Sequence, residues 1–175
     1  MGDPRKAKKT FHRPRMIWTT DQLNAELYIM GSYGLRNKRE LWKAETEVAR
    51  IRNQARALLA ISAELRAEKE RRLLSFLSRL GLAREGATLD DILNLKVEDL
   101  LERRLQTIVM KKTGTSSPYQ ARQIVSHGHV SIGNRKVNIP GYIVKAEEEQ
   151  QILIHIEIPG TTAAATAAAQ PASPP

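Results

Sequence analysis

The sequence predicts a mostly helical α+β fold, in which a helical domain with long amphipathic helices precedes a small domain of two helices and a short antiparallel sheet. Three observations lead to this prediction: apolar residues recur at helical spacing over residues 38–60, Ser117-Pro118 starts a short helix, and Gly133-Asn134 separates two short strand-like segments. We expect a basic extended arm at residues 1–19, the helical domain at 20–100, the small domain with its C-terminal strands at 101–160, and a disordered Ala/Thr/Pro-rich tail at 161–175.

The first domain is expected to begin with a helix from Thr20 that ends at Gly31, which stands where a C′ glycine belongs. The second helix carries an apolar stripe with spacings of three and four, made by Leu41, Ala44, Val48, Ile51, Ala55 and Leu58. A third helix begins after Ser62 and ends at Gly81, with one apolar face made by Leu65, Leu73, Phe76, Leu77 and Leu80. Neither stripe can be buried alone, so the two helices should pack as a hairpin. A two-chain coiled coil is the competing interpretation, and the repeat lasts under three heptads.

Two shorter helices should follow. The segment from Thr88 to Asp91 has the pattern of a capping box and opens the first of them. The second is predicted over residues 97–110, with Arg103 and Arg104 facing outward or flanking the core.

The small domain is predicted in more detail. A helix over residues 118–127 buries Ala121, Ile124 and Val125 and ends at Gly128. In the hairpin that follows, Ser131 pairs with Lys136, Val130 with Val137 and His129 with Asn138, which gives an apolar back and a polar, basic front. A further strand at 151–158 places its isoleucines on one face: Ile152, Ile154, Ile156 and Ile158.

Charge is unevenly distributed along the chain. Its 28 Lys and Arg against 19 Asp and Glu give a net charge of +9, of which residues 1–15 carry +5 and residues 101–145 carry +7. A surplus of this kind is typical of proteins that bind a polyanion, and by itself it leaves DNA, RNA and an anionic membrane surface open. The absence of cysteine excludes disulfides, thiolate zinc sites and a cysteine nucleophile. With no long apolar run and no signal sequence, we expect a soluble intracellular protein.

The residues of the small domain carry a family resemblance. The run from Leu105 through Ala121-Arg122-Gln123, Gly128-His129-Val130, the hairpin, Val137 and Pro140 resembles the RNA-binding domain named after ribosomal protein S-four. The opening MGDPRKAKKTFHRPRMIW and the bipartite plan are similar to the archaeal and eukaryotic-type S-four ribosomal proteins, so the resemblance spans residues 2–158 and the archaeal family is indicated. The hairpin reads Gly-Asn where that family usually has Asn-Gly, which leaves the turn type open, and the tail matches no family pattern.

The resemblance implies a structural constituent of the small ribosomal subunit, located in the cytoplasm. Such a protein binds small-subunit ribosomal RNA as a primary binder, nucleates assembly of the subunit body, contributes to translational accuracy and contacts ribosomal protein S-five. It implies no cofactor, no metal and no membrane.

The candidate RNA-binding residues fall into three groups. The arm should contact phosphates through Arg5, Lys6, Lys8, Lys9, Arg13 and Arg15. The small domain should add phosphate contacts through Arg103, Arg104, Lys111, Lys112, Arg122, Arg135 and Lys136. Ribose or base contacts are expected from Tyr119, Gln120, Gln123, His127 and His129. Arg122, on the polar face of its helix, is expected to serve binding without contributing to stability.

Three other functional classes compete with this one. Catalysis is disfavoured because His127 and His129 have no third ligand type near them in sequence and no Gly-rich phosphate loop is present. A free-standing RNA-binding stress or ribosome quality-control factor with the same small domain is the main alternative, although such factors usually lack the long helical half. A DNA-binding protein is not excluded by charge alone.

Overall fold

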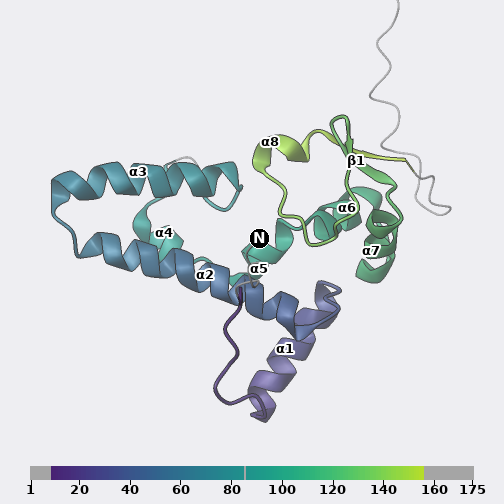
Figure 1. Cartoon of the computed structure of the whole chain (residues 1–175), viewed down its shortest axis with the longest axis horizontal. Helices are drawn as coiled ribbons and strands as arrows, with labels where there is room; N and C mark the ends of the chain where they lie inside the picture. The colour runs from purple at the N-terminus through teal and green to yellow at the C-terminus, as the bar shows by residue number, and fades with distance from the viewer. Residues whose placement is uncertain (1–8, 85, 156–175) are drawn as a thin grey trace, which may run out of the picture.

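The computed structural model describes residues 9–84 and 86–155. The fold is mostly helical, with one small sheet, as predicted (Figure 1). Its elements, in chain order, are α1 (Thr20–Ser32), α2 (Lys38–Leu59), α3 (Ala63–Arg79), α4 (Leu89–Leu93), α5 (Val97–Glu102), α6 (Leu105–Thr113), α7 (Pro118–Ser126), β1 (Val130–Ile132), β2 (Arg135–Lys136), α8 (Ala146–Glu149) and β3 (Ile152–Ile154).

Helices α2 and α3 form the predicted hairpin, with α4 beside them (Figure 1). The stripe predicted on α2 is buried along its whole length, from Leu41 to Leu58. On α3 the predicted face is only partly right, because the buried arc runs through Leu73 and Leu77. Leu65 and Phe76 lie outside this arc and stay 57% and 51% exposed.

The end of α1 differs from the prediction. Gly31 lies inside the helix, and the left-handed residue is Gly34, with φ of +59°. The amide of Gly34 donates to the carbonyl of Gly31 at 3.3 Å, and the amide of Leu35 donates to the carbonyl of Met30 at 2.9 Å. These two hydrogen bonds are those of a Schellman motif, in which a buried residue such as Leu35 follows the glycine. Two glycines three residues apart offered two possible ends, and the packing of Leu35 selects the second.

The single helix predicted over residues 97–110 is wrong. Residues 97–113 instead form two helices, α5 and α6, divided at Arg103 and Arg104. The division occurs because the backbone of residues 142–144 takes over the hydrogen bonds there. The amide of Leu105 donates to the carbonyl of Tyr142 at 2.8 Å, and the amide of Val144 donates to the carbonyl of Arg103 at 2.9 Å. The apolar spacing continues across the break, so the sequence carries no local signal for it.

The sheet has the order β2-β1-β3, with antiparallel pairing throughout. The predicted register is confirmed at Ser131 and Lys136, and the amide of Val137 donates to the carbonyl of Val130 at 3.0 Å. Ile152 and Ile154 face the core as predicted, whereas Ile156 and Ile158 lie outside the described residues.

The buried apolar residues form two clusters. One extends from Leu35 to Leu101 and belongs to α2–α5, and the other extends from Leu105 to Ile152 and belongs to α6, α7 and the sheet. In the described part of the chain, every helix is too short or too polar to cross a lipid bilayer.

Candidate nucleic-acid interface

The arm is extended but attached to α2. Residues 9–19 form neither helix nor strand, and they descend from α2 to the start of α1 (Figure 1). The ring of Phe11 stacks on Trp42 with centroids 6.0 Å apart, and the amide of His12 donates to Thr46 Oγ1 at 2.9 Å. Lys9 Nζ lies 5.2 Å from the centroid of the Phe11 ring. The described part of the arm therefore lies against α2 at Phe11 and His12.

The attachment leaves the outer arginines of the arm free. Arg13 and Arg15 are exposed, and neither forms an ion pair with any residue that the structure describes. Arg5, Lys6 and Lys8, also predicted to bind RNA, lie outside the described residues.

A buried carboxylate holds the residue on which the arm packs. Glu26 is 5% exposed; Trp42 Nε1 donates to its Oε1 at 3.2 Å, and Lys38 Nζ lies 2.7 Å from its Oε2. Burial alone would raise the pKa of Glu26, but the hydrogen bonds from Lys38 and Trp42 outweigh it and lower the pKa below the ordinary value of 4.5.

The lowered pKa of Glu26 predicts that the contact between α1 and α2 loses stability in acid. A carboxylate with a lowered folded-state pKa adds stability that is fully present above its unfolded pKa and is lost as the pH falls through the folded value. We therefore expect the difference in unfolding free energy between wild type and Glu26→Gln to shrink as the pH falls below 4.5. Urea unfolding between neutral and acidic pH measures it, and a difference that stays constant over that range would contradict the prediction.

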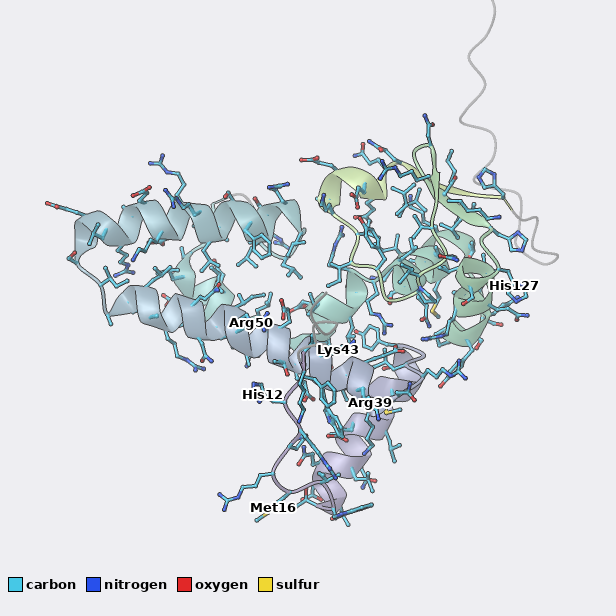
Figure 2. All side chains as sticks on the ribbon, viewed as in Figure 1. His12, Met16, Arg39, Lys43, Arg50 and His127 are labelled. Carbon is cyan, nitrogen blue, oxygen red and sulfur yellow. The ribbon has the colours of Figure 1, made fainter. Side chains whose placement is uncertain are left out.

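Helix α7 presents the polar face that the sequence predicts. Its first turn is capped by Ser117, whose Oγ accepts from the amide of Tyr119 at 3.3 Å, with Pro118 at the first helical position. The face toward α6 is buried, and it consists of Ala121, Ile124 and Val125. The opposite face is open to solvent and carries Tyr119, Gln120, Gln123 and His127, the last of which is at the end of α7 in Figure 2.

The hairpin continues this face. Arg135 and Lys136 on β2 are exposed and make no side-chain hydrogen bond or ion pair within the described ranges. The two turn residues are Gly133, with φ of +57°, and Asn134, whose φ is not positive; type I′ is therefore excluded, because it needs a positive φ at both. Gly128 has φ of +74°, and a Cβ there would overlap the side chain of Lys136. Lys136 thus lies against the C-terminal end of α7, where the helix dipole favours a cation.

Three histidines lie near the hairpin. The rings of His127 and His129 have centroids 6.2 Å apart, and His155 Nε2 lies 2.8 Å from Ser131 Oγ. No group of three or more metal-ligating side chains occurs among residues 9–84 and 86–155.

Two of the predicted phosphate-binding arginines point inward instead. Arg104 is only 7% exposed, and its Nη2 donates to Glu40 Oε2 at 2.7 Å. Arg103 Nη1 pairs with Glu149 at 2.6 Å, and its Nη2 donates to the carbonyl of Val144 at 3.1 Å. The expectation that these arginines face outward or flank the core is wrong for Arg104, which is buried, whereas Arg103 is half-buried. The break in the helix turns both toward acceptors that lie far away in the sequence.

Arg122 also has an internal role. Its Nη2 lies 3.1 Å from Glu40 Oε1 and its Nη1 lies 3.4 Å from Gln106 Oε1. Burial would raise the pKa of Glu40, but the hydrogen bonds from Arg122 and Arg104 lower it below 4.5. Arg122 shares a carboxylate with a buried arginine, so we now predict that it contributes to stability as well, contrary to the expectation from its place on the polar face.

Lys111 and Lys112 stay available at the surface. Lys111 Nζ lies 3.1 Å from Glu102, and both side chains are more than half exposed. Lys112 Nζ donates to the carbonyl of Glu149. Exposed ion pairs of this kind contribute little free energy and exchange readily for another anion.

Comparison with known proteins places this geometry in a family. The model of the S4 domain matches residues 103–149, which contain α6, α7 and the hairpin. The small ribosomal subunit protein uS4 of Nitrosopumilus maritimus is 55% identical over 152 residues, covering 87% of this chain and 76% of the relative. The chain belongs to the uS4 family. The uS4 protein of Ignicoccus hospitalis is 53% identical over 152 residues, covering 87% of this chain and 92% of the relative.

Membership in the uS4 family confirms the resemblance read from the sequence, including its archaeal type. The uS4 family consists of ribosomal proteins and not of enzymes.

The uS4 fold also brings together residues that sequence reasoning missed. Gln106 is 1% exposed, and its Nε2 donates to the carbonyls of Gly34 at 3.2 Å and Pro118 at 2.9 Å. Arg39 and Lys43 on α2 are exposed and have no partner in the described part of the chain; they are labelled with Arg50 in Figure 2. Residues 39, 43 and 50 share one helix face, a signal that the near-neutral charge of residues 16–100 concealed.

Proposed function

We propose that this chain is a structural constituent of the small ribosomal subunit and binds small-subunit ribosomal RNA. The observation that carries the proposal is the α7–hairpin face, a surface of exposed side chains without internal ion pairs. Residues 103–146 contain no Asp or Glu, so no carboxylate from this segment opposes an approaching phosphate. The face consists of the exposed side chains of Tyr119, Gln120, Gln123, His127, Arg135 and Lys136, together with the half-buried His129.

Each kind of side chain on this face suits folded RNA. Arg135 and Lys136 supply charge for phosphates, and the amides of Gln120 and Gln123 can pair with 2′-hydroxyls or base edges. Tyr119 is 55% exposed and offers a ring on which an unpaired base can stack. Arg13 and Arg15 of the arm and Lys111 and Lys112 of α6 are further exposed cations outside this face.

Fractionation on a sucrose gradient tests the ribosomal role. We expect stoichiometric co-migration with the small subunit that survives washing at high salt. A free pool that joins ribosomes only under stress would instead identify a quality-control factor. Preference for duplex DNA over ribosomal RNA in a competition filter assay would identify a DNA-binding protein.

One variant tests the face itself. The slope of log K against log salt concentration is negative, and Arg135→Gln is expected to reduce its magnitude by about 0.7–0.9, because one phosphate contact is lost. The matched control is Arg71→Gln on α3, also exposed and without an ion pair in the described part of the chain. Filter binding to small-subunit ribosomal RNA over a salt series measures both slopes. Equal slopes for the two variants would remove Arg135 from the interface.

Finer roles follow from the family resemblance. As a primary binder the protein would nucleate assembly of the subunit body, contact ribosomal protein S-five and contribute to accuracy, in the cytoplasm. Reconstitution of the small subunit with and without this chain tests the first role: we expect assembly to stall without it, and equal yields would contradict it. Cross-linking within the assembled subunit tests the contact with S-five.

A further inference from the structure

A pocket lies where the C-terminal ends of α1 and α6 meet beside α5. Its volume is about 570 Å³, within the range of pockets that bind small ligands in proteins. None of the side chains of the α7–hairpin face lines this α1–α6 pocket. The lining residues that matter most are Tyr28, Ser32 and Tyr33 at the end of α1, Glu98 of α5, and Lys111 and Thr115 at the end of α6.

Two helix ends and a carboxylate make the α1–α6 pocket electronegative. The C-terminal end of a helix carries the equivalent of about half a negative elementary charge, which favours a cation. Helix α1 has no basic residue in its last turn, and α6 ends at the same place. Glu98 forms no ion pair within residues 9–84 and 86–155, whereas Lys111 lies 3.1 Å from Glu102 and is neutralised by it. The lining therefore keeps one unpaired negative charge.

The phenol of Tyr33 reports this field. Burial raises the pKa of Tyr33 above its ordinary value of 10.0, and the negative charges of Glu102, Glu98 and Asp99 raise it further. An electrostatic potential that disfavours a phenolate also disfavours a phosphate. The α1–α6 pocket is thus unlike the basic surfaces of the chain.

A buried hydroxyl in the α1–α6 pocket lacks a partner. Thr115 is only 7% exposed, and its Oγ1 is buried without a hydrogen bond to any described residue. Buried polar atoms are nearly always hydrogen-bonded, so an atom of this kind indicates a missing partner. An N–H donor in the pocket would supply it.

Aromatic rings form part of the wall. Tyr28 is 75% exposed and Tyr33 is half-buried, so both have ring surface that a ligand can cover. Rings of this kind attract an ammonium or guanidinium group and pack well against an apolar stem. A metal ion fits less well, because no group of three or more metal-ligating side chains occurs in the described part of the chain.

We propose that the α1–α6 pocket binds an organic monocation, an ammonium or guanidinium group on an apolar stem. Glu98 is its counter-ion, Thr115 Oγ1 accepts one of its N–H groups, and Tyr28 and Tyr33 cover its stem. The site goes beyond the proposed function, because phosphate is not its ligand. Two sources carry this chemistry: a free aliphatic amine, and a lysine or arginine side chain of a neighbouring protein.

Titration of the purified full chain with butylammonium and butylguanidinium chloride tests the site without any RNA. We expect saturable NMR shifts of the backbone amides of Tyr33, Gly114 and Thr115, and none with butanol, which has the stem without the charge. Glu98→Gln should weaken binding about two- to fivefold, as the loss of one exposed charge contact requires.

The matched control is Glu64→Gln on α3, which is also exposed and unpaired in the described ranges and should bind like the wild type. Equal affinities for Glu98→Gln and the wild type, or no saturable shifts with either cation, would overturn the inference. Because the titration contains no RNA, either result leaves the proposed function standing.

A single thiol distinguishes the two sources, since the chain has no cysteine. Ser32 is exposed in the lining, so Ser32→Cys keeps the carboxylate and reports occupancy by its rate of maleimide labelling. This second test rests on the proposed function, because it compares the free chain with the assembled small subunit after removal of free amines.

A side chain from a neighbouring protein should slow labelling several-fold in these subunits, and a cross-linker should join the thiol to a lysine or arginine of that protein. With a free amine as the source, the subunits should label at the free-chain rate until butylammonium is added. Labelling at the free-chain rate with and without butylammonium, or cross-linking to RNA alone, would overturn the inference.

Discussion

Replacing Glu40 with glutamine is expected to destabilise the protein by about 3 kcal/mol, because the change leaves a buried arginine without its counter-charge. Glu40 accepts from Arg104 at 2.7 Å and from Arg122 at 3.1 Å, and Arg104 is 7% exposed. Glutamine has nearly the same shape, so no cavity accompanies the change and the effect reports the charge. Urea unfolding followed by circular dichroism measures the loss of unfolding free energy.

The same helix offers a matched control. Glu47 also pairs with an arginine, Arg50 at 3.0 Å, but the two side chains are 45% and 59% exposed. An exposed pair of this kind contributes less than about 0.5 kcal/mol, so Glu47→Gln should unfold almost like the wild type. Similar stabilities for Glu40→Gln and Glu47→Gln would show that the shared carboxylate does not hold the two halves of the protein together.

Gly34→Ala is expected to cost about 2–4 kcal/mol, since a side chain is unfavourable there for two reasons. The backbone is left-handed, with φ of +59°. A Cβ would also lie 2.8 Å from Pro118 Cβ and 2.7 Å from Gln106 Nε2. Thermal and urea unfolding both measure the loss. A stability within error of the wild type would mean that the α1–α2 turn can move away from α7.

A second glycine, three residues earlier, provides the control, with the opposite expected sign. Gly31 lies inside α1, and a Cβ there meets no atom within 4 Å. Gly31→Ala should therefore raise stability by about 0.5–1 kcal/mol, because alanine loses less backbone entropy in a helix. Destabilisation by Gly31→Ala would indicate that α1 ends earlier than described.

Much of the candidate interface was predictable because its signals are local. The capping hydroxyl of Ser117 and the proline after it start α7, and the apolar residues at 121, 124 and 125 determine which face is left for solvent. The two-residue loop at Gly133-Asn134 sets the register that exposes Arg135 and Lys136. Each of these features depends on residues within one helical turn or one hairpin.

The internal role of three predicted contact residues was not predictable in this way. A count of charges does not distinguish a paired arginine from a free one. The carboxylates that accept from Arg103, Arg104 and Arg122 are 46, 64 and 82 residues away in the sequence. Lys43 was missed because the charge count was taken over residues 16–100, which are near neutral as a whole, and this count hid the shared helix face of residues 39, 43 and 50.

The sequence by itself determined the mostly helical α+β fold, the polar face of α7, the hairpin register and the family. Periodicity, capping and turn residues act between neighbours, so they can be read without coordinates. Only the tertiary structure decided which cations are free, where α5 ends and which glycine closes α1. Burial and ion pairing between residues distant in the chain depend on how the two parts of the protein pack. That packing places Arg104 and Arg122 on either side of Glu40, so both form ion pairs inside the protein instead of standing free at the surface.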